Sequence, residues 1–392
     1  MKVSNRARSV PPSGIRKFFE LVLGVEDVIS LGVGEPDFVT PWHVREAAMY
    51  ALEKGYTMYT SNYGLLELRE EIARAVKRDY SIEYDPKSEI LITVGVSEGF
   101  DLAARAVVNP GDEVIIPEPC YVAYKPCTIF AGGIPKVIAT GVENEFKVTP
   151  EQIEKKINKR TKALVLNYPN NPTGAAMSKK ELEGIADVVN EHDLIAISDE
   201  VYGKLTYDGR HTSFASLNGM QERTILLNGF SKAYAMTGWR VGYACGSEDV
   251  IEAMMKIHQY SMLCAPVASQ FAAIEALRNG EKEMLAMVKQ YNQRRRLVVK
   301  RLNEIGLTCF EPRGAFYTFP SIKKTGLSSE KFAEHLLKEE KVAVVPGNVF
   351  GESGEGFVRC SYAASLEDLN EALNRMERFI KRVSNDKNLY ST

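Results

Sequence analysis

Short apolar runs alternate with stretches of helical periodicity through the middle of the chain. The runs are rich in Val, Ile and Leu, and β-branched residues of this kind favour strands. They lie at Glu89–Val94, Glu113–Pro117, Lys162–Asn167, Leu194–Asp199, Thr224–Gly229 and Val241–Cys245. Continuous apolar runs separated by helices are typical of a mostly parallel sheet. The pattern therefore predicts an α/β part with helices over the sheet.

Two of the intervening segments begin with helix-capping signals. Ser178 is followed three residues later by Glu181, and apolar residues then recur at helical spacing. Thr149 precedes Pro150 and is followed by Gln152, which predicts a second capped helix start. The alternation of strands and helices is therefore sustained.

After residue 265 the pattern changes and predicts a second, smaller α+β domain. A long charged helical stretch, Glu281–Glu304, is followed by strand-like pieces at Phe316–Pro320, Val342–Val345 and Phe357–Ser361 and by a final helix from Ser365. A chain of 392 residues also exceeds what one core normally serves. We place the large domain at residues 46–284 and the small domain, with an N-terminal arm, at 1–45 and 285–392.

Composition and charge narrow the classes of partner. The formal net charge is −2 with both signs interspersed, which predicts neither nucleic acid nor an anionic membrane as a partner. No run approaches the roughly 20 apolar residues of a membrane helix. The six cysteines include no C-x-x-C pair, the N-terminus has no signal-peptide pattern, and the five histidines show no metal spacing. We therefore expect a soluble, cytoplasmic protein that binds a small molecule and no metal.

Polar and aromatic residues follow the ends of the predicted strands. In doubly wound sheets, ligands bind beyond the carboxyl ends of the strands. The segments at these ends are 95–99, 117–121, 170–174, 199–202 and 229–232. A small-molecule site is therefore predicted at this edge of the sheet.

The first of these segments, Gly95-Val96-Ser97-Glu98-Gly99, matches the G-x-S-x-G motif of hydrolases. A hydrolase also needs a histidine later in the chain, and no distinctive context surrounds the candidates, which are His192, His211, His258 and His335. The same strand-to-helix turn serves equally well as a phosphate site, because free N–H groups at a helix start bind anions. A simple capped turn at Ser97 is the third interpretation.

Lys232 stands between an apolar strand and a segment of small residues, where burial disfavours its charge. A lysine of this kind forms Schiff bases with carbonyl compounds. Ser231 and Arg240 add a hydroxyl and a cation for a phosphate. Asp199 ends a buried strand, a position that favours a cationic partner such as a ring nitrogen. Each residue taken alone has an ordinary alternative interpretation. Lys232 could be a solvated surface residue, and Asp199 could cap a helix or stand in a turn.

Together these residues resemble the class I and II aminotransferases of fold type I, in the branch that contains prokaryotic aspartate and aromatic aminotransferases. The resemblance covers essentially the whole chain. The motifs that match in order and spacing are Gly34-Glu35-Pro36-Asp37-Phe38, Tyr59 with Gly64 and Leu68-Arg69-Glu70, Asn170–Gly174, Ser198–Tyr202, Ser231–Arg240, Pro312–Tyr317 and Val358–Tyr362. The resemblance implies a mostly parallel seven-stranded sheet with helices on both faces, a smaller α+β domain, and pyridoxal 5′-phosphate as cofactor.

The resemblance also implies a role for each site residue. Lys232 would carry the cofactor as a Schiff base, Asp199 would pair with its pyridine nitrogen, and Tyr202 would contact its phenolic oxygen. The other cofactor-binding residues that it implies are Val96, Ser97, Glu98, Tyr121, Asn171, Ser231 and Arg240, with Tyr59 reaching in from the other subunit of a homodimer. The substrate α-carboxylate would meet Arg359, aided by Asn171 and Gly34. Relatives often place a serine where this chain has Gly229, so one phosphate hydroxyl is expected to be missing or replaced.

The implied activity is transfer of an amino group from an L-amino acid to 2-oxoglutarate by a ping-pong mechanism, with the freed Lys232 as base. Such a base needs a neutral amine, so its pKa is expected well below the ordinary lysine value of about 10.4. Aspartate is the favoured donor, and aromatic amino acids, alanine or LL-diaminopimelate are the alternatives. A lyase that uses the same cofactor and a hydrolase based on Ser97 are the alternatives from other classes.

Overall fold

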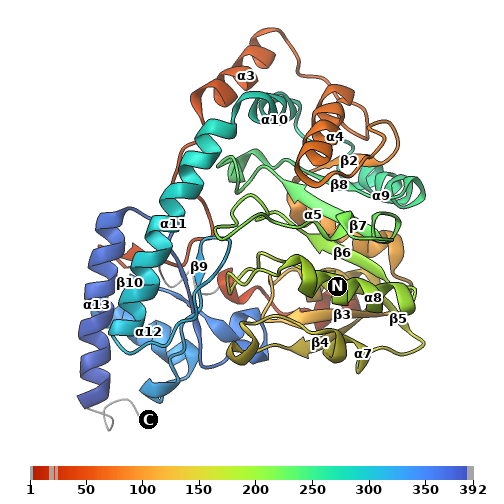
Figure 1. Cartoon of the computed structure of the whole chain (residues 1–392). Coiled ribbons are helices and arrows are strands. Elements are labelled where there is room, and N and C mark those ends of the chain that lie inside the picture. The colour runs from red at the N-terminus through yellow and green to blue at the C-terminus, as the bar shows by residue number, and fades with distance from the viewer. Residues whose placement is uncertain (1–2, 17–21, 23–24, 386–392) are drawn as a thin grey trace.

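The computed structural model describes residues 3–16, 22 and 25–385 of the 392-residue chain. Its elements form two groups, as Figure 1 shows. The large group is built on an extended sheet, and the smaller group contains short sheets and the C-terminal helix. No helix in the described ranges is long and apolar enough to cross a membrane.

Within the described residues, seven strands form the large sheet in the order β2-β8-β7-β6-β5-β3-β4. Neighbouring strands pair in parallel except at β8, which is antiparallel to both β2 and β7. The strands are β2 (Ile90–Thr93), β3 (Glu113–Glu118), β4 (Ile134–Ala139), β5 (Thr161–Leu166), β6 (Ile195–Asp199), β7 (Thr224–Gly229) and β8 (Gly242–Cys245). The mostly parallel sheet that the resemblance implied is thereby confirmed.

The hydrophobic pattern located every strand of this sheet except β4. The observed limits of the other strands lie within one residue of the predicted runs. β4 is an edge strand that contains Pro135 and Lys136, and Ile134 at its start is 39% exposed. An edge strand needs less apolar burial than a central one, so it carries no continuous apolar run.

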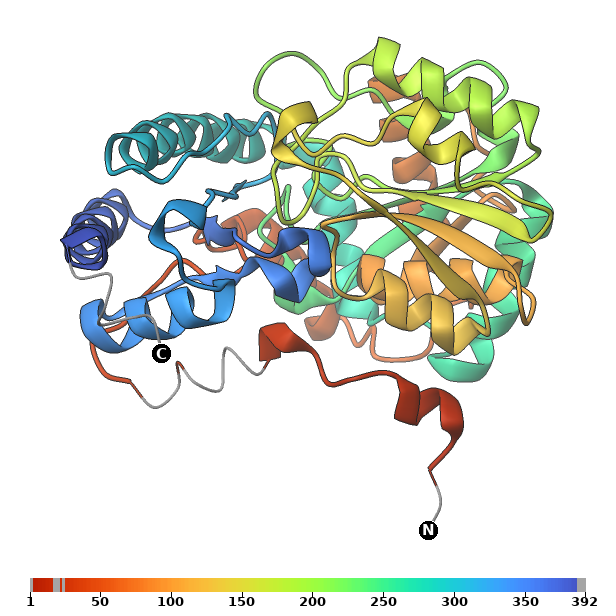
Figure 2. The same ribbon diagram turned by 90° about the horizontal axis from the view of Figure 1, so that it is seen from below.

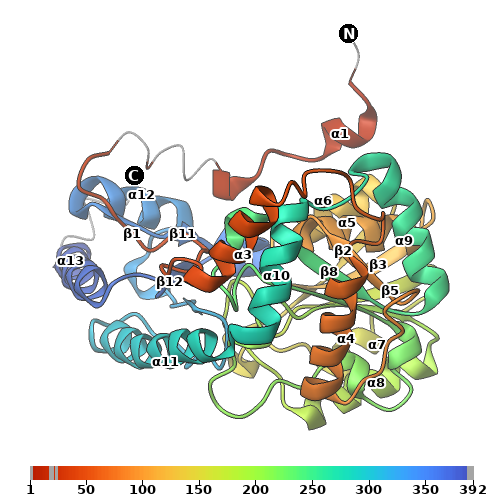
Figure 3. The same ribbon diagram turned by 90° about the horizontal axis from the view of Figure 1, so that it is seen from above.

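Helices cover both faces of the large sheet, as Figure 3 shows. One face packs against α5 (Gly95–Val107), α6 (Tyr124–Ala131) and α9 (Glu248–Ser261). The other face packs against α4 (Leu66–Tyr80), α7 (Pro150–Glu154) and α8 (Lys179–Glu191), with α10 (Val267–Asn279) packed between α4 and α3 (Trp42–Glu53). Successive strand residues point to opposite faces, so Ile115 belongs to one core and its neighbours Val114 and Ile116 belong to the other.

Both predicted capping boxes are present. The Ser178 hydroxyl accepts from the Glu181 N–H at 3.4 Å, and the Glu181 carboxylate accepts from the Ser178 N–H at 2.7 Å. Thr149 and Gln152 form the same reciprocal pair at the start of α7, where Pro150 occupies the first helical position. These local signals alone therefore set where two of the covering helices begin.

The smaller group combines short sheets with long helices. β1 (Ile29–Ser30) pairs in parallel with β10 (Val342–Ala343), while β12 (Val358–Ser361) lies between β9 (Tyr317–Thr318) and β11 (Val345–Pro346) and is antiparallel to both. The helices are α11 (Glu281–Glu304), α12 (Ser329–Glu340) and α13 (Leu366–Asn385). The domain limits proposed after residues 45 and 284 fall inside the continuous helices α3 and α11. The exact division therefore stays a prediction.

Phe146, in the loop after β4, joins the two groups. Phe146 and the preceding Glu145 have φ values of 57° and 55°, a region that non-glycine residues rarely adopt. The Phe146 side chain is only 2% exposed. Its ring packs at centroid distances of 5.3 to 5.5 Å against rings of the smaller group, which are Phe310, Phe319 and Phe357. A residue of the large group thus fills part of the core of the smaller one.

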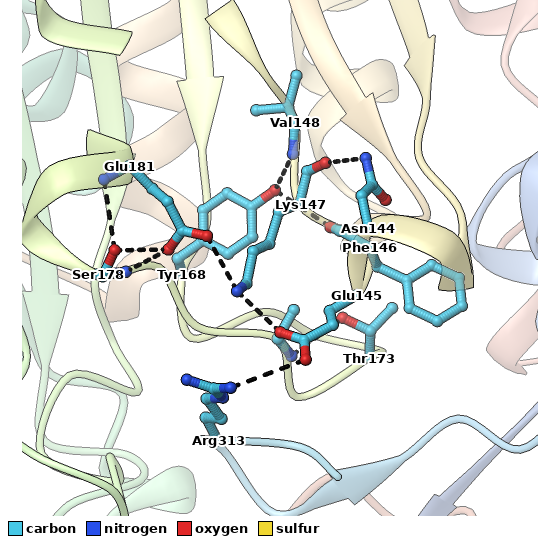
Figure 4. Close-up of polar contacts among 11 residues, drawn as sticks. Asn144, Glu145, Phe146, Lys147, Val148, Tyr168, Thr173, Ser178, Glu181 and Arg313 are labelled. Carbon is cyan, nitrogen blue, oxygen red and sulfur yellow. Dashed lines mark hydrogen bonds and ion pairs between the residues drawn. The ribbon is translucent and has the colours of Figure 1, made fainter. Parts of the chain in front are cut away.

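Polar contacts hold this loop in place, as Figure 4 shows. The buried Tyr168 hydroxyl accepts from one backbone N–H of the loop at 3.0 Å and donates to a loop carbonyl at 3.2 Å. Lys147 pairs with Glu181 at 3.1 Å and with Glu145 at 2.8 Å. Glu145 also lies 3.8 Å from the guanidinium of Arg313 in the smaller group. The loop is therefore bound on both sides of the junction.

The described part of the N-terminal arm runs along the outside of both groups (Figure 2). Arg6 lies in α1 (Asn5–Ser9), and its guanidinium donates to the carbonyl of Phe130 in α6 at 3.3 Å. Gly14 lies so close to Val349 of the smaller group that an added β-carbon would be 3.0 Å from it. The sequence analysis grouped the arm with the small domain, and its described part contacts both groups of its own chain.

Candidate active site

A cavity of about 420 Å³ opens beyond the carboxyl ends of β3, β5, β6 and β7, where the sequence predicted a site. The smaller group contributes Tyr317 and Arg359, so the cavity lies where the two groups meet. The predicted residues that line it are Gly34, Val96, Ser97, Tyr121, Asn171, Asp199, Tyr202, Ser231, Lys232, Arg240 and Arg359. Two predicted residues, Tyr59 and Glu98, do not line it.

Lys232 follows β7, and its amine reaches across the cavity. Nζ donates to the carbonyl oxygen of Gly34 at 2.6 Å. The same atom lies 5.9 Å and 5.8 Å from the ring centroids of Tyr202 and Phe316. Removal from water is the main cause that lowers the pKa of Lys232 to about 8. A neutral amine, as a nucleophile or a base requires, is therefore accessible close to neutral pH.

Asp199 is the last residue of β6, and its buried carboxylate is held by hydrogen bonds. Tyr124 donates its hydroxyl to Oδ2 at 2.6 Å, and the N–H of Val201 donates to Oδ1 at 3.2 Å. Burial raises the pKa of Asp199 to about 6, against the lowering effect of these bonds. A cation placed beside this carboxylate would offset the cost of burying its charge.

The start of α5 and Arg240 form an anion site. Gly95 has a φ of 75°, and a β-carbon there would lie 2.6 Å from Nη2 of Arg240. Ser97 and Ser231, which carry hydroxyl groups, line the same cavity as Arg240. N–H groups of a helix start, hydroxyls and a guanidinium are the groups that bind phosphate in proteins. The phosphate interpretation of the Gly95–Gly99 turn is therefore the one that the geometry supports.

Gly229 stands where the resemblance led us to expect a serine, and the structure leaves little room for a side chain there. An added β-carbon would lie 3.0 Å from the Cα of Gly242 and 3.2 Å from a methyl of Val96. The close pairing of β7 with β8 thus accounts for glycine at this position. The hydroxyls that remain for a phosphate are those of Ser97 and Ser231.

The side chain of Glu98 was expected to help hold the phosphate, and its position argues against that role. Its carboxylate accepts from the N–H of Val94 and lies 2.7 Å from Nδ1 of the buried His258. These partners turn the negative charge away from the cavity, where it would repel an anion. The backbone contribution of Glu98 stays a prediction.

The same contacts argue against a hydrolase based on Ser97. The Ser97 hydroxyl lies 3.4 Å from the hydroxyl of Tyr121. His258, whose imidazole contacts this turn, pairs with Glu98 instead of Ser97. Among the described residues no histidine forms a hydrogen bond with Ser97, which a nucleophilic serine requires.

Arg359 lies in β12, lines the cavity from the smaller group and is only 2% exposed. Nη1 donates to Oδ1 of Asn171 at 2.8 Å, and Nη2 donates to the carbonyl of Gly32 at 2.7 Å. Its Nε is buried and has no hydrogen-bond partner among the described residues. Nη1 and Nη2 each carry a second N–H group, and the side chain lines the cavity. A guanidinium with such donors fits a bound carboxylate.

Three further lining residues complete the site, and the contacts that they make there were not predicted from the sequence. Tyr124 donates to Asp199, and Tyr317 pairs with Tyr202 through hydroxyls 2.8 Å apart. These partners are 75 and 115 residues apart in the chain, so no local spacing reveals them. Asn167 donates to the Asp199 carbonyl at 3.0 Å. It directly follows β5, so the strand-end rule was a signal that could have found it.

Comparisons with known proteins agree with this geometry. The family model "Aminotransferase class I and II" matches residues 26–376. Aromatic-amino-acid aminotransferase 2 of Thermococcus litoralis and aspartate aminotransferase of Pyrococcus abyssi are each 50% identical to the chain, over 97% of its length and 99% of theirs.

Solved structures show the same likeness. The aromatic aminotransferase of Pyrococcus horikoshii is 51% identical with a TM-score of 0.90, over 94% of this chain and 99% of its own. The aspartate aminotransferase of Thermus thermophilus with maleate is 39% identical with a TM-score of 0.93, over 96% of this chain and 99% of its own. The chain therefore belongs to the class I and II aminotransferases.

Proposed function

We propose that this aminotransferase carries its cofactor on Lys232 and moves the amino group of an L-amino acid, with aspartate as the favoured donor, to 2-oxoglutarate. The cofactor of the family is pyridoxal 5′-phosphate. One observation carries the proposal. A desolvated amine, a buried carboxylate and an arginine with an unused N–H meet in one cavity, at Lys232, Asp199 and Arg359.

The residues of the cavity fit pyridoxal phosphate group by group. The Lys232 amine suits the carbonyl carbon, the Asp199 carboxylate suits the ring nitrogen, and the start of α5 with Arg240 suits the phosphate. The remaining proposed contacts are the ring oxygen with Asn171 and Tyr202, the ring face with Tyr121, and the phosphate with Val96, Ser97 and Ser231. This match of donors to groups supports the assignment.

The bound cofactor supplies an electron sink that weakens the Cα–H bond of the substrate. Asp199 favours the protonated ring nitrogen, because a buried carboxylate is stabilised by an adjacent cation. Arg359 and Asn171 fix the α-carboxylate, so that Cα is presented to the amine of Lys232. With a pKa of about 8, Lys232 has a neutral fraction that would take the Cα proton and deliver it to the imine carbon of the cofactor.

Aromatic amino acids are the second candidate donors, and the charges of the cavity wall are compatible with them. Among the described lining residues, the cationic side chains are Lys232, Arg240 and Arg359, and each already has a proposed role. None is left for the second carboxylate of aspartate, which would need a cation from outside this wall. The apolar lining residues include Ile15 and Val33. A relative named as an aromatic-amino-acid aminotransferase and one named as an aspartate aminotransferase are each 50% identical to this chain.

A homodimer is proposed as the working form. Large apolar side chains are exposed on α3, on the segment that follows it and at the end of α9, and they include Trp42 at 58%, Met58 at 76%, Tyr59 at 83% and Tyr260 at 88%. Asn62 donates to the carbonyl of Leu263 at 2.9 Å, which ties the last two of these regions together. Large exposed apolar side chains on neighbouring segments are typical of a protein interface. A second copy would cover it and would bring its Tyr59 to the phosphate site.

A cytoplasmic location is also proposed. All six cysteines are free thiols in the described part of the chain, and Cys120, Cys245, Cys309 and Cys360 are buried. Persistent free thiols are typical of reducing compartments.

The proposed function is tested by the visible absorption spectrum of the purified protein, titrated with single amino acids in the absence of a keto acid. We expect a cofactor chromophore that is converted to its aminated form, with stoichiometric release of the matching keto acid. Titrations with aspartate and tyrosine rank the two candidate donors. A protein that binds no cofactor when pyridoxal phosphate is added would overturn the assignment. Consumption of the amino acid with release of ammonia or carbon dioxide, and without net amination of the cofactor, would indicate a lyase.

A further inference from the structure

Tyr317 contacts both halves of the cavity. Its hydroxyl lies 2.8 Å from the hydroxyl of Tyr202, on the side proposed for the cofactor. Its ring lies beneath the guanidinium of Arg359, with 4.4 Å between Cζ and the ring centroid, on the side proposed for the substrate carboxylate. The side chain lines the cavity and is only 1% exposed.

We propose that Tyr317 is a positioning residue for the aminotransferase reaction. Its hydroxyl orients the hydroxyl of Tyr202 toward the ring oxygen of the cofactor, and its ring holds Arg359 in the orientation that binds the substrate carboxylate. The inference rests on the roles proposed above for Tyr202 and Arg359.

The role of the hydroxyl follows from the number of protons in the pair. Each tyrosine hydroxyl has one proton to donate. If Tyr202 donates to Tyr317, it has none left for a ring oxygen, whereas donation by Tyr317 leaves the Tyr202 proton free for the cavity. Donation by Tyr317 also polarises the Tyr202 O–H bond and makes it a stronger donor. Burial raises the pKa of Tyr202 well above its usual value, so the proton is retained.

The role of the ring follows from the packing around Arg359. The guanidinium lies 4.4 Å from the ring centroid of Tyr317 and 4.9 Å from that of Phe350. Aromatic faces hold a planar guanidinium through cation–π attraction and stacking. The Tyr317 ring is itself fixed, because its hydroxyl fills the space beside Gly34, where an added β-carbon would lie 2.7 Å away.

Two substitutions separate the hydroxyl from the ring. Tyr317→Phe removes only the hydroxyl, and Tyr317→Leu also removes the aromatic face. The readouts are the pKa of the visible chromophore in the holoenzyme, obtained by absorbance titration, and the Kd of maleate, obtained from the absorbance change on binding. Neither readout requires turnover.

A weaker donor at Tyr202 stabilises the ionised ring oxygen less, so both variants should raise the chromophore pKa. We expect a rise of about half a unit. The Kd of maleate should stay within about twofold in Tyr317→Phe and should increase about fivefold in Tyr317→Leu, because only leucine removes the face under Arg359.

The Tyr202→Phe background shows whether the hydroxyl acts through Tyr202. In that background Tyr317→Phe should no longer shift the chromophore pKa, because coupled residues are not additive. Equal shifts in both backgrounds, or no shift in the wild-type background, would overturn the role of the hydroxyl. An unchanged Kd in Tyr317→Leu would overturn the role of the ring.

Tyr362→Phe is the matched control. It removes the hydroxyl of another buried tyrosine, which lies 3.4 Å from the hydroxyl of Tyr207 and outside the cavity wall, and it should change neither readout. A wild-type protein without any chromophore would refute the proposed function and this inference together. A chromophore whose pKa ignores Tyr317 would refute the inference alone.

Discussion

Replacement of Arg359 by lysine is expected to weaken substrate binding while it preserves the positive charge and the fold. The guanidinium already donates to Asn171 and to the Gly32 carbonyl at 2.8 and 2.7 Å, and Nη1 and Nη2 each keep a second N–H group for a ligand. A lysine ammonium is a point charge that cannot match the planar fork which binds a carboxylate bidentately. The variant therefore tests the geometry of the contact and not its charge alone.

The size of the effect follows from the contact that is lost. A hydrogen bond to a charged group contributes about 1.5–3 kcal/mol, which is about tenfold to a hundredfold in an equilibrium constant. We expect Arg359→Lys to raise the KM of the amino donor by about this factor, and Arg359→Ala to raise it at least as much. Because the carboxylate is bound before and during the reaction, KM should change more than kcat.

Steady-state kinetics of the purified variants, with aspartate and with tyrosine as donors, provide the assay. Arg313→Lys is the control, because Arg313 is 53% exposed, pairs with Glu145 at 3.8 Å and lies outside the cavity wall. Its KM values should equal those of the wild type. Wild-type KM values in Arg359→Lys would refute the assignment of the α-carboxylate to this residue.

Three further predictions follow from burial and exposure. Phe146→Ala should lower the free energy of unfolding in urea by about 3–5 kcal/mol, because Phe146 is only 2% exposed. The control Phe130→Ala, at a site that is 37% exposed, should lower it far less. Equal losses in the two variants would contradict the role of the Phe146 loop. In the cofactor-free protein, the pKa of Lys232 is about 8 in the folded state and about 10.4 in the unfolded chain, which therefore keeps the proton to higher pH. The free energy of unfolding of the wild type, measured relative to that of Lys232→Met, should therefore rise from about pH 8 to about pH 10. A difference in denaturation midpoints that does not change with pH would contradict this prediction. Mixed dimers of Lys232→Ala and Tyr59→Ala chains should regain activity above the sum of the separate variants, since one site per dimer is intact; no gain would argue against a shared site.

Much of the large sheet could be predicted because its strands are buried on both faces. Apolar runs such as Leu194–Asp199 are long enough to stand out from their helical surroundings. β4 could not be found in this way, because an edge strand such as Ile134–Ala139 mixes exposed and buried positions. The Phe146 contact was also out of reach, since it depends on two residues with positive φ and on rings more than a hundred residues away.

The candidate site could be predicted where a chemically reactive side chain lies at or near the end of a predicted strand. Asp199 ends β6, and Lys232 lies three residues beyond the end of β7. The resemblance supplied Arg359, which the structure places in the same cavity. The side-chain partners were not predictable, because hydroxyl pairs such as Tyr202 with Tyr317 form only in three dimensions. For Glu98 the motif fixed the position of the residue and left the direction of its carboxylate undetermined.

The claim that Lys232 carries the cofactor is tested most directly by mapping the modified lysine. Borohydride makes the C=N link permanent, and trypsin then cleaves after unmodified lysine and arginine. Because modified Lys232 resists cleavage, the predicted product is the peptide of residues 224–240, bounded by Arg223 and Arg240, with the mass of the reduced cofactor added. Cofactor mass on another lysine, or only unmodified peptides 224–232 and 233–240 from protein that visibly binds cofactor, would contradict the account.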